Sequence, residues 1–146
     1  FRKNLVNYKF VEIISLPRVE DIITEQVILD LSHFFPGGPT PYKPEQYRLH
    51  LLNMISILEN YENYHVILLN QKLFSDIKIL IRKNVFSIIS KYSPRPVTMY
   101  ITYDGITDGL YDYINERIKE ATQKAYDRNQ VLLRLRALLS ELNQQI

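Results

Sequence analysis

Apolar and polar residues recur along the chain with periods that predict helices toward both ends and strands in the middle. After Pro17, apolar side chains follow spacings of three and four as far as Phe35, the pattern of an amphipathic helix. A second such pattern follows Pro44 and ends at Asn60. Its apolar face would consist of Tyr47, Leu51, Met54, Ile55 and Leu58. The connection is rich in glycine and proline, which end helices, so residues 17–60 are predicted to form a helix–loop–helix segment.

The middle of the chain has the pattern of a sheet. Residues 64–69 form a continuous apolar run typical of a central strand, and "IKILIRK" alternates as a half-buried strand does. Asn84 marks a turn, "VFSIISKY" returns, and "SPRP" forms a rigid corner before "VTMYITY". These short spacings favour antiparallel hairpins over residues 64–103. Near the start, "YKFVEIISL" is β-branched and aromatic, so residues 1–16 are predicted to be a linker or a first strand.

A C-terminal helical segment is predicted over residues 107–146. Its apolar stripe thins around Asp127 and resumes at Val131. Leucines this far beyond the sheet need another surface, which could be the core, a membrane surface or a second copy of the chain. Acidic residues are too frequent for the membrane surface, and we expect a homodimer seam. The seam would consist of Leu132, Leu135, Leu138, Leu139 and Leu142.

The expected fold class is therefore α+β. We expect an antiparallel β-sheet of four to five strands with helices packed on it and a long C-terminal helix. A length of 146 residues with an ordinary apolar fraction predicts a single domain over residues 1–146. The chain has no cysteine, which fits the cytoplasm, and it has no apolar run long enough for a signal peptide or a membrane helix. Because the chain does not begin with methionine, we interpret it as a fragment of a longer protein.

Charge is unevenly distributed although the net charge is only +2. Residues 20–35 carry four acids and no lysine or arginine, whereas residues 71–96 carry six basic residues against Asp76. One interpretation is a pair of solvated faces of opposite sign. Another is an acidic helix that docks on a basic sheet face, within one chain or between two. The low net charge argues against a general nucleic-acid binder of the strongly basic kind.

The motifs of catalysis and metal binding are missing. Asp30, His33 and His50 could meet as metal ligands, but no HExxH pattern accompanies them. The loop at residues 37–38 follows a predicted helix and lacks the Lys-Ser/Thr of a phosphate loop, so a helix stop explains it. In "DGITDG", an isoleucine occupies a calcium-ligand position. Since GxSxG is also lacking, we expect no enzyme activity, no catalytic residue, no metal and no cofactor.

Tyrosine is the unusual feature of the composition, with eleven residues against six phenylalanines and no tryptophan. Phenol rings offer contact area together with a hydrogen-bonding tip, so they suit the edge of a core and also the wall of a ligand pocket. Two tyrosines follow the Gly-Pro loop, and others lie on or after the predicted sheet. The expected ligand-binding residues are Gly37, Gly38, Tyr42, Tyr47, His50 and Tyr100.

Three segments together resemble the C-terminal portion of bacterial helix-turn-helix transcriptional regulators of the Cro/CI-like (XRE) kind. They are "FFPGGPTPY", "LLNMISILENYENYHVILL" and "SPRPVTMYITYDGITDGLYDYINERI", and the likeness covers about residues 14–119. In such regulators a variable sensory or oligomerisation domain follows a small DNA-binding domain. The resemblance implies that a DNA-binding part precedes Phe1. No helix-turn-helix occurs within the chain, so contact with DNA is expected only through that part.

Two functions remain open. The first is a regulatory effector-binding and dimerisation domain that responds to a small molecule or a peptide. The alternative is a stand-alone structural or protein-interaction module without a small-molecule ligand. A hydrolase or transferase would need convergent acid–base groups that the sequence does not show.

Overall fold

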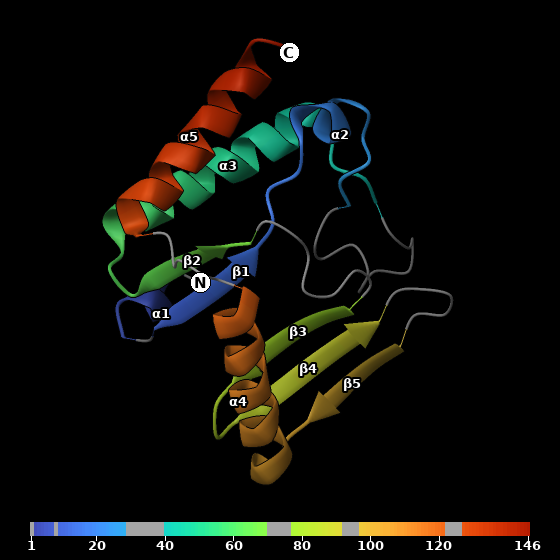
Figure 1. The fold of residues 1–146 in the computed structure, drawn as a ribbon, viewed down its shortest axis with the longest axis vertical. Coiled ribbons are helices and arrows are strands. Elements are labelled where there is room, and N and C mark those ends of the chain that lie inside the picture. Colours follow the sequence, from blue (N-terminus) through green and yellow to red (C-terminus); the bar gives the residue numbers. More distant parts are fainter. Residues whose placement is uncertain (1, 8, 29–39, 70–76, 92–96, 122–126) are drawn as a thin grey trace. The chain divides into compact units, whose positions relative to one another are not determined.

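The computed structural model describes residues 2–7, 9–28, 40–69, 77–91, 97–121 and 127–146, and these form an α+β fold (Figure 1). The chain divides into two compact units. The first consists of Phe1–Asn70 together with Ala125–Ile146, and the second of Gln71–Lys124. The second unit is therefore inserted in the chain between two halves of the first. A single domain over residues 1–146 was expected from the length of the chain. The periodicity of the sequence indicates individual helices and strands, but it does not show which of them pack together.

The first unit is built on a parallel pair of strands, β1 and β2, which are paired from Phe10↔Tyr64 to Ile14↔Leu68. Its elements are α1 (Arg2–Leu5), β1 (Phe10–Ile14), α2 (Val19–Ile23), α3 (Pro44–Asn60), β2 (Tyr64–Leu68) and α5 (Arg128–Asn143). α3 and α5 lie side by side, and both pack against β2 (Figure 1). Residues 1–16 were predicted to be a linker or a first strand, and within them residues 10–14 form β1.

The core of the first unit lies between α3, α5 and one face of the strand pair. The predicted helix between Pro44 and Asn60 is confirmed at both ends, and its five predicted apolar residues are all buried. In β2, Tyr64, Val66 and Leu68 alternate as buried residues, so their face of the strand is the core face. Glu12 is paired with Val66 and therefore lies on the same face.

The second unit is an antiparallel sheet with one helix. Its elements are β3 (Ile77–Arg82), β4 (Phe86–Lys91), β5 (Val97–Ile101) and α4 (Asp104–Ala121). The strand order is β3-β4-β5, and α4 packs on β3 and β4. At the β3–β4 turn Asn84 has a φ of 57°, which asparagine tolerates, and its backbone N–H donates to Oδ1 of Asp108 at 3.0 Å. This bond attaches the turn to α4.

The prediction of one antiparallel sheet of four to five strands needs correction. The hairpins of residues 77–101 are confirmed as a three-stranded antiparallel sheet, but residues 64–68 pair in parallel with β1 in a separate sheet. A continuous apolar run indicates a strand that is buried on both faces. It does not show whether the partner strand is the next one in sequence or one more than fifty residues earlier.

The helix predicted between Pro17 and Phe35 is also wrong in extent. α2 ends at Ile23, and residues 29–39 lie outside the described part of the chain. The helix ends in a Schellman motif, in which Gln26 N–H donates to Asp21 O at 2.8 Å and Glu25 N–H to Ile22 O at 3.1 Å. Glu25 has a φ of 55°, the left-handed conformation that this motif requires at the residue directly after the C-cap. Periodicity did not reveal the stop because glycine usually occupies this position.

Replacing Glu25 by glycine is expected to raise the free energy of unfolding by about 0.5–1 kcal/mol. The left-handed conformation costs an L residue about 1–2 kcal/mol, and part of the gain is offset by the greater freedom of glycine in the unfolded chain. Denaturant unfolding of the variant measures the change. Glu25→Ala keeps the Cβ atom and serves as the control, so an equal gain in both variants would contradict the strain at this position.

The C-terminal helical segment is divided between the two units. α4 ends at Ala121 and α5 begins at Arg128, with Asp127 as its N-cap, where the carboxylate accepts from Gln130 N–H at 2.8 Å. The predicted weakening of the apolar stripe near Asp127 therefore marks the start of a separate helix. The helical segment expected over residues 107–146 thus contains two helices that belong to different compact units.

Candidate functional site

Three of the expected ligand-binding residues lie together at the start of α3. The ring centroids of Tyr42 and Tyr47 are 5.3 Å apart, and that of His50 is 5.6 Å from the first and 5.8 Å from the second. Tyr47 and His50 are three positions apart on α3, so they share one face of the helix. We call these three residues, together with Glu12 and Tyr64, the tyrosine cluster.

The chain before α3 is fixed so that Tyr42 faces the helix. Tyr42 N–H donates to Val27 O at 2.7 Å, and Pro41 forms an isolated bridge with Ile28. Pro44 then occupies the first turn of α3, where its lack of an N–H group costs nothing. These contacts hold the ring of Tyr42 edge-on against that of Tyr47, at an interplanar angle of 90°.

Glu12 supplies the negative charge of the tyrosine cluster. It lies on the core face of β1, and its Oε2 accepts a hydrogen bond from the Tyr64 hydroxyl. Its carboxylate also acts electrostatically on Tyr42, Tyr47 and His50. Sequence reasoning missed this residue. The sequence did contain a signal for it. Glu12 is the single acid in "YKFVEIISL", and in an alternating strand it shares a face with Phe10 and Ile14.

Burial sets the protonation states within the cluster. Loss of hydration, reinforced by charge on neighbouring groups, raises the pKa of the Tyr42 and Tyr47 phenols above 10. Burial lowers the pKa of His50 below its ordinary value, and the Glu12 carboxylate opposes part of this shift. Near neutral pH the phenols are therefore hydrogen-bond donors, and the neutral imidazole offers one donor and one acceptor. Such a set can bind a polar aromatic or apolar molecule without a metal.

Lowering the pH is expected to destabilise the first unit through His50. Its pKa in the folded chain lies below the value of about 6.5 in the unfolded chain, so the unfolded state binds more protons between these two values. The free energy of unfolding therefore decreases as pH falls from 6.5 through the folded pKa. Urea unfolding at a series of pH values measures this slope, which His50→Gln should reduce.

His65 provides the control for this titration. Its pKa is also lowered, first by partial burial and then by Lys9 and Arg128, but its side chain is largely exposed on β2. His65→Gln should change the pH dependence less than His50→Gln does. The same slope in wild type and in His50→Gln would show that the imidazole of His50 is not the responsible group.

The other expected ligand residues belong to other parts of the chain. Gly37 and Gly38 lie outside the described part of the chain. Tyr100 belongs to β5 in the second unit, where its side chain is 65% exposed and its ring centroid is 5.9 Å from that of Phe86. Asp30 and His33, which were considered as metal ligands with His50, also lie outside the described residues.

The leucines predicted to form a homodimer seam pack to different extents in the core of their own chain. Leu135 and Leu142 are completely buried in the core of their own chain, and Leu138 is nearly so. Leu132 and Leu139 are partly buried and pack against the same core. The helix that carries these leucines, α5, packs on α3 and β2. A side chain that is fully buried within one chain has no surface left for a second copy.

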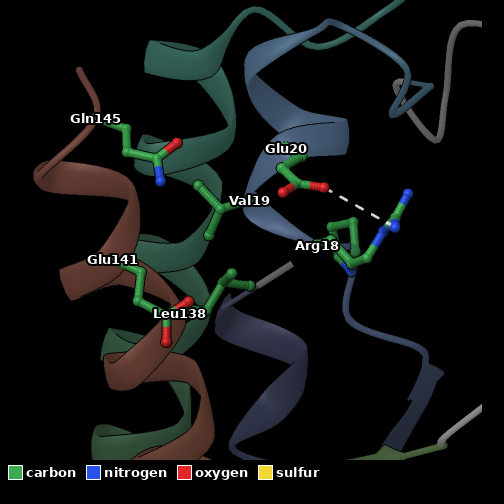
Figure 2. A pocket seen from close by; sticks show the side chains of 7 residues that line it. Arg18, Val19, Glu20, Leu138, Glu141 and Gln145 are labelled. Carbon is green, nitrogen blue, oxygen red and sulfur yellow. Dashed lines mark ion pairs between the residues drawn. The ribbon is translucent and has the colours of Figure 1, made fainter.

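A shallow pocket of about 350 Å³ lies elsewhere in the first unit, between the start of α2 and the end of α5 (Figure 2). Arg18, Val19 and Glu20 line one side, and Leu138, Glu141 and Gln145 line the other (Figure 2). The Arg18 guanidinium is already paired with Asp21 at 2.8 Å and with Glu20 at 3.9 Å. Because the side chains of Arg18 and Glu20 are largely exposed and Arg18 is already paired with two carboxylates, the pocket has no unpaired arginine to offer an anionic ligand.

The comparisons with known proteins do not assign a family. No family model, curated protein or solved structure matches the chain. In the described part of the chain, no helix combines the length and the apolar character needed to span a membrane. The function therefore has to be inferred from the residues of the two units.

Proposed function

We propose that the chain is a regulatory effector-binding and dimerisation domain of a cytoplasmic bacterial transcriptional regulator, which contacts DNA only through another part of the protein. The observation that carries this proposal is the tyrosine cluster. Three rings from the start of α3 and the segment before it meet within 6 Å of one another, beside a carboxylate from β1. The resemblance of the sequence to the C-terminal portion of helix-turn-helix regulators supports the regulatory role.

The chemistry of the cluster limits the effector. Glu12 already accepts from Tyr64 and has further lone pairs, so it favours a hydrogen-bond donor or a positive group. The rings of Tyr42 and His50 are only partly buried, and they suit a flat or apolar portion of the same molecule. A small molecule or a peptide side chain with both features would satisfy the site.

α3 connects the cluster to the rest of the first unit. Tyr47 and His50 lie in its first turns, and the remainder of the helix packs along α5. An effector that binds one arrangement of α3 and α5 more tightly than another would shift the balance between them. In a dimer of the full regulator, such a shift would change the spacing of the DNA-binding parts.

Native mass spectrometry of the purified chain tests the proposal, because it measures bound ligand and oligomeric state together. We expect a dimer that carries additional small-molecule mass, which is lost in Tyr42→Ala. Leu49→Ala is the control, since Leu49 lies on α3 beside His50 but is largely exposed. Unfolding curves of both variants establish that each is folded.

The remaining outcomes discriminate among alternatives. A chain free of ligand under conditions that preserve non-covalent complexes would favour the protein-interaction module. Ligand mass that persists in both Tyr42→Ala and His50→Ala would place the effector outside the tyrosine cluster. A monomer at high protein concentration by light scattering would remove dimerisation from the proposal.

A further inference from the structure

β5 is an edge strand of the three-stranded sheet in the second unit (Figure 1). It pairs with β4 on one side, and no other described strand pairs with it on the other. The outer side of an edge strand presents backbone N–H and C=O groups that have no partner within the sheet. Such an edge is a template on which a further strand can pair.

The side chains of β5 are as accessible as its edge. Four of its five residues, from Val97 to Tyr100, are exposed, and the fifth is only partly buried. In the central strand, β4, Ser87 and Ser90 are instead buried, and α4 packs on β3 and β4. An apolar surface is therefore left at β5, where Val97 is 52% and Met99 is 49% exposed.

The two edges of this sheet differ in charge. β3 carries Lys78 and Arg82, and charged side chains on an edge strand oppose the addition of another strand. β5 has the sequence "VTMYI", which contains neither a charged residue nor a proline. The sequence thus protects one edge of the sheet and leaves the other able to pair.

We propose that β5 pairs in antiparallel orientation with β5 of a second copy of the chain. The two sheets then form one sheet of six strands. The register that overlaps the whole strand places Met99 opposite Met99 at the two-fold axis, with Thr98 opposite Tyr100 and Val97 opposite Ile101. This inference rests on the dimerisation in the proposed function and assigns a surface to it.

A second copy fits the β5 edge better than a charged peptide does. Because β5 is uncharged, a copy meets it without repulsion, whereas an acidic or a basic peptide would find no opposite charge on the strand. A two-fold interface uses the same surface on both subunits, and a strand that pairs with itself satisfies this condition. Both outer strands of the joined sheet are then β3, whose charges stop further addition, so the assembly closes as a dimer.

Sedimentation velocity of the full chain over a dilution series tests this pairing. β5 is only about 17 Å long, so we expect a wild-type dimer that dissociates on dilution. Met99→Lys places two lysines opposite one another at the axis and should raise the dissociation constant at least about tenfold. Leu80→Lys is the matched control, because Leu80 is 47% exposed, close to Met99, but lies on β3. It should dimerise as wild type does.

An exchange of charge separates the pairing from damage to the sheet. Met99→Glu alone should also be monomeric, whereas an equimolar mixture of Met99→Lys and Met99→Glu should dimerise, because opposite charges then face one another. A mixture that stays monomeric would overturn the proposal. Equal losses of dimer in Met99→Lys and Leu80→Lys, or oligomers that grow beyond the dimer with concentration, would also overturn it.

The same measurements distinguish this interface from dimerisation itself. A wild-type dimer that persists unchanged in Met99→Lys would overturn the β5 interface and leave the dimerisation of the proposed function in place. A wild-type chain that stays monomeric at every concentration would overturn both.

Discussion

Replacing Leu135 by alanine is expected to lower the free energy of unfolding by about 3–4 kcal/mol. Leu135 is completely buried in the core of the first unit, on the side of α5 that packs on α3 and β2. Truncation removes apolar contacts and leaves a cavity that the surrounding helices fill only in part. Chemical unfolding of the purified chain measures the loss as a lower transition midpoint with an unchanged slope.

The same experiment distinguishes the core from a dimer seam. Leu133→Ala lies on the same helix, two residues away and 65% exposed, and should change stability by less than about 0.5 kcal/mol. Light scattering should give the same molar mass for wild type and Leu135→Ala under folding conditions. A dimeric wild type together with a monomeric Leu135→Ala of unchanged free energy of unfolding would contradict the placement of Leu135 in the core of its own chain.

Replacing Arg128 by alanine is expected to cost about 3 kcal/mol. Its guanidinium connects the first residue of α5 to the end of α3. Nη2 donates to the carbonyls of Tyr61, at 2.8 Å, and Leu58. Nη1 lies 3.4 Å from two further carbonyls, those of Glu62 and Tyr64. Hydrogen bonds from a charged donor contribute about 1.5–3 kcal/mol, and a cation also complements the negative end of a helix.

One variant tests whether the planar geometry of the Arg128 guanidinium or its charge stabilises the fold, and a second variant serves as the control. Arg128→Lys keeps the charge but not the planar fork, so it should recover only part of the stability. Arg136→Ala removes another arginine of α5, whose ion pair with Glu59 is exposed on both sides and contributes at most about 1 kcal/mol. Equal losses in Arg128→Ala and Arg136→Ala would contradict a special role for the carbonyl contacts of Arg128.

Local sequence patterns were sufficient to predict the elements that are defined by residues close together in the chain. Pro44, the spacing of the apolar residues and Asn60 predicted α3 from end to end, because a helix forms its hydrogen bonds within itself. The β3–β4–β5 hairpins could be predicted equally well, since strands that follow one another after a short connection have few alternative pairing partners. The grouping of Tyr42, Tyr47 and His50 followed from the same local geometry.

Tertiary packing was needed wherever the partner lies far away in the chain. Glu12 joins the tyrosine cluster because β1 pairs with β2, whose residues come more than fifty positions later. Leu135 is a core residue rather than an interface residue because α5 returns to α3 after the whole second unit. An apolar stripe shows that a surface must be buried, but many surfaces can bury it equally well. Only the three-dimensional arrangement of the elements selects one of these surfaces, since the hydrophobic effect depends on the apolar area removed from water and not on which partner covers it.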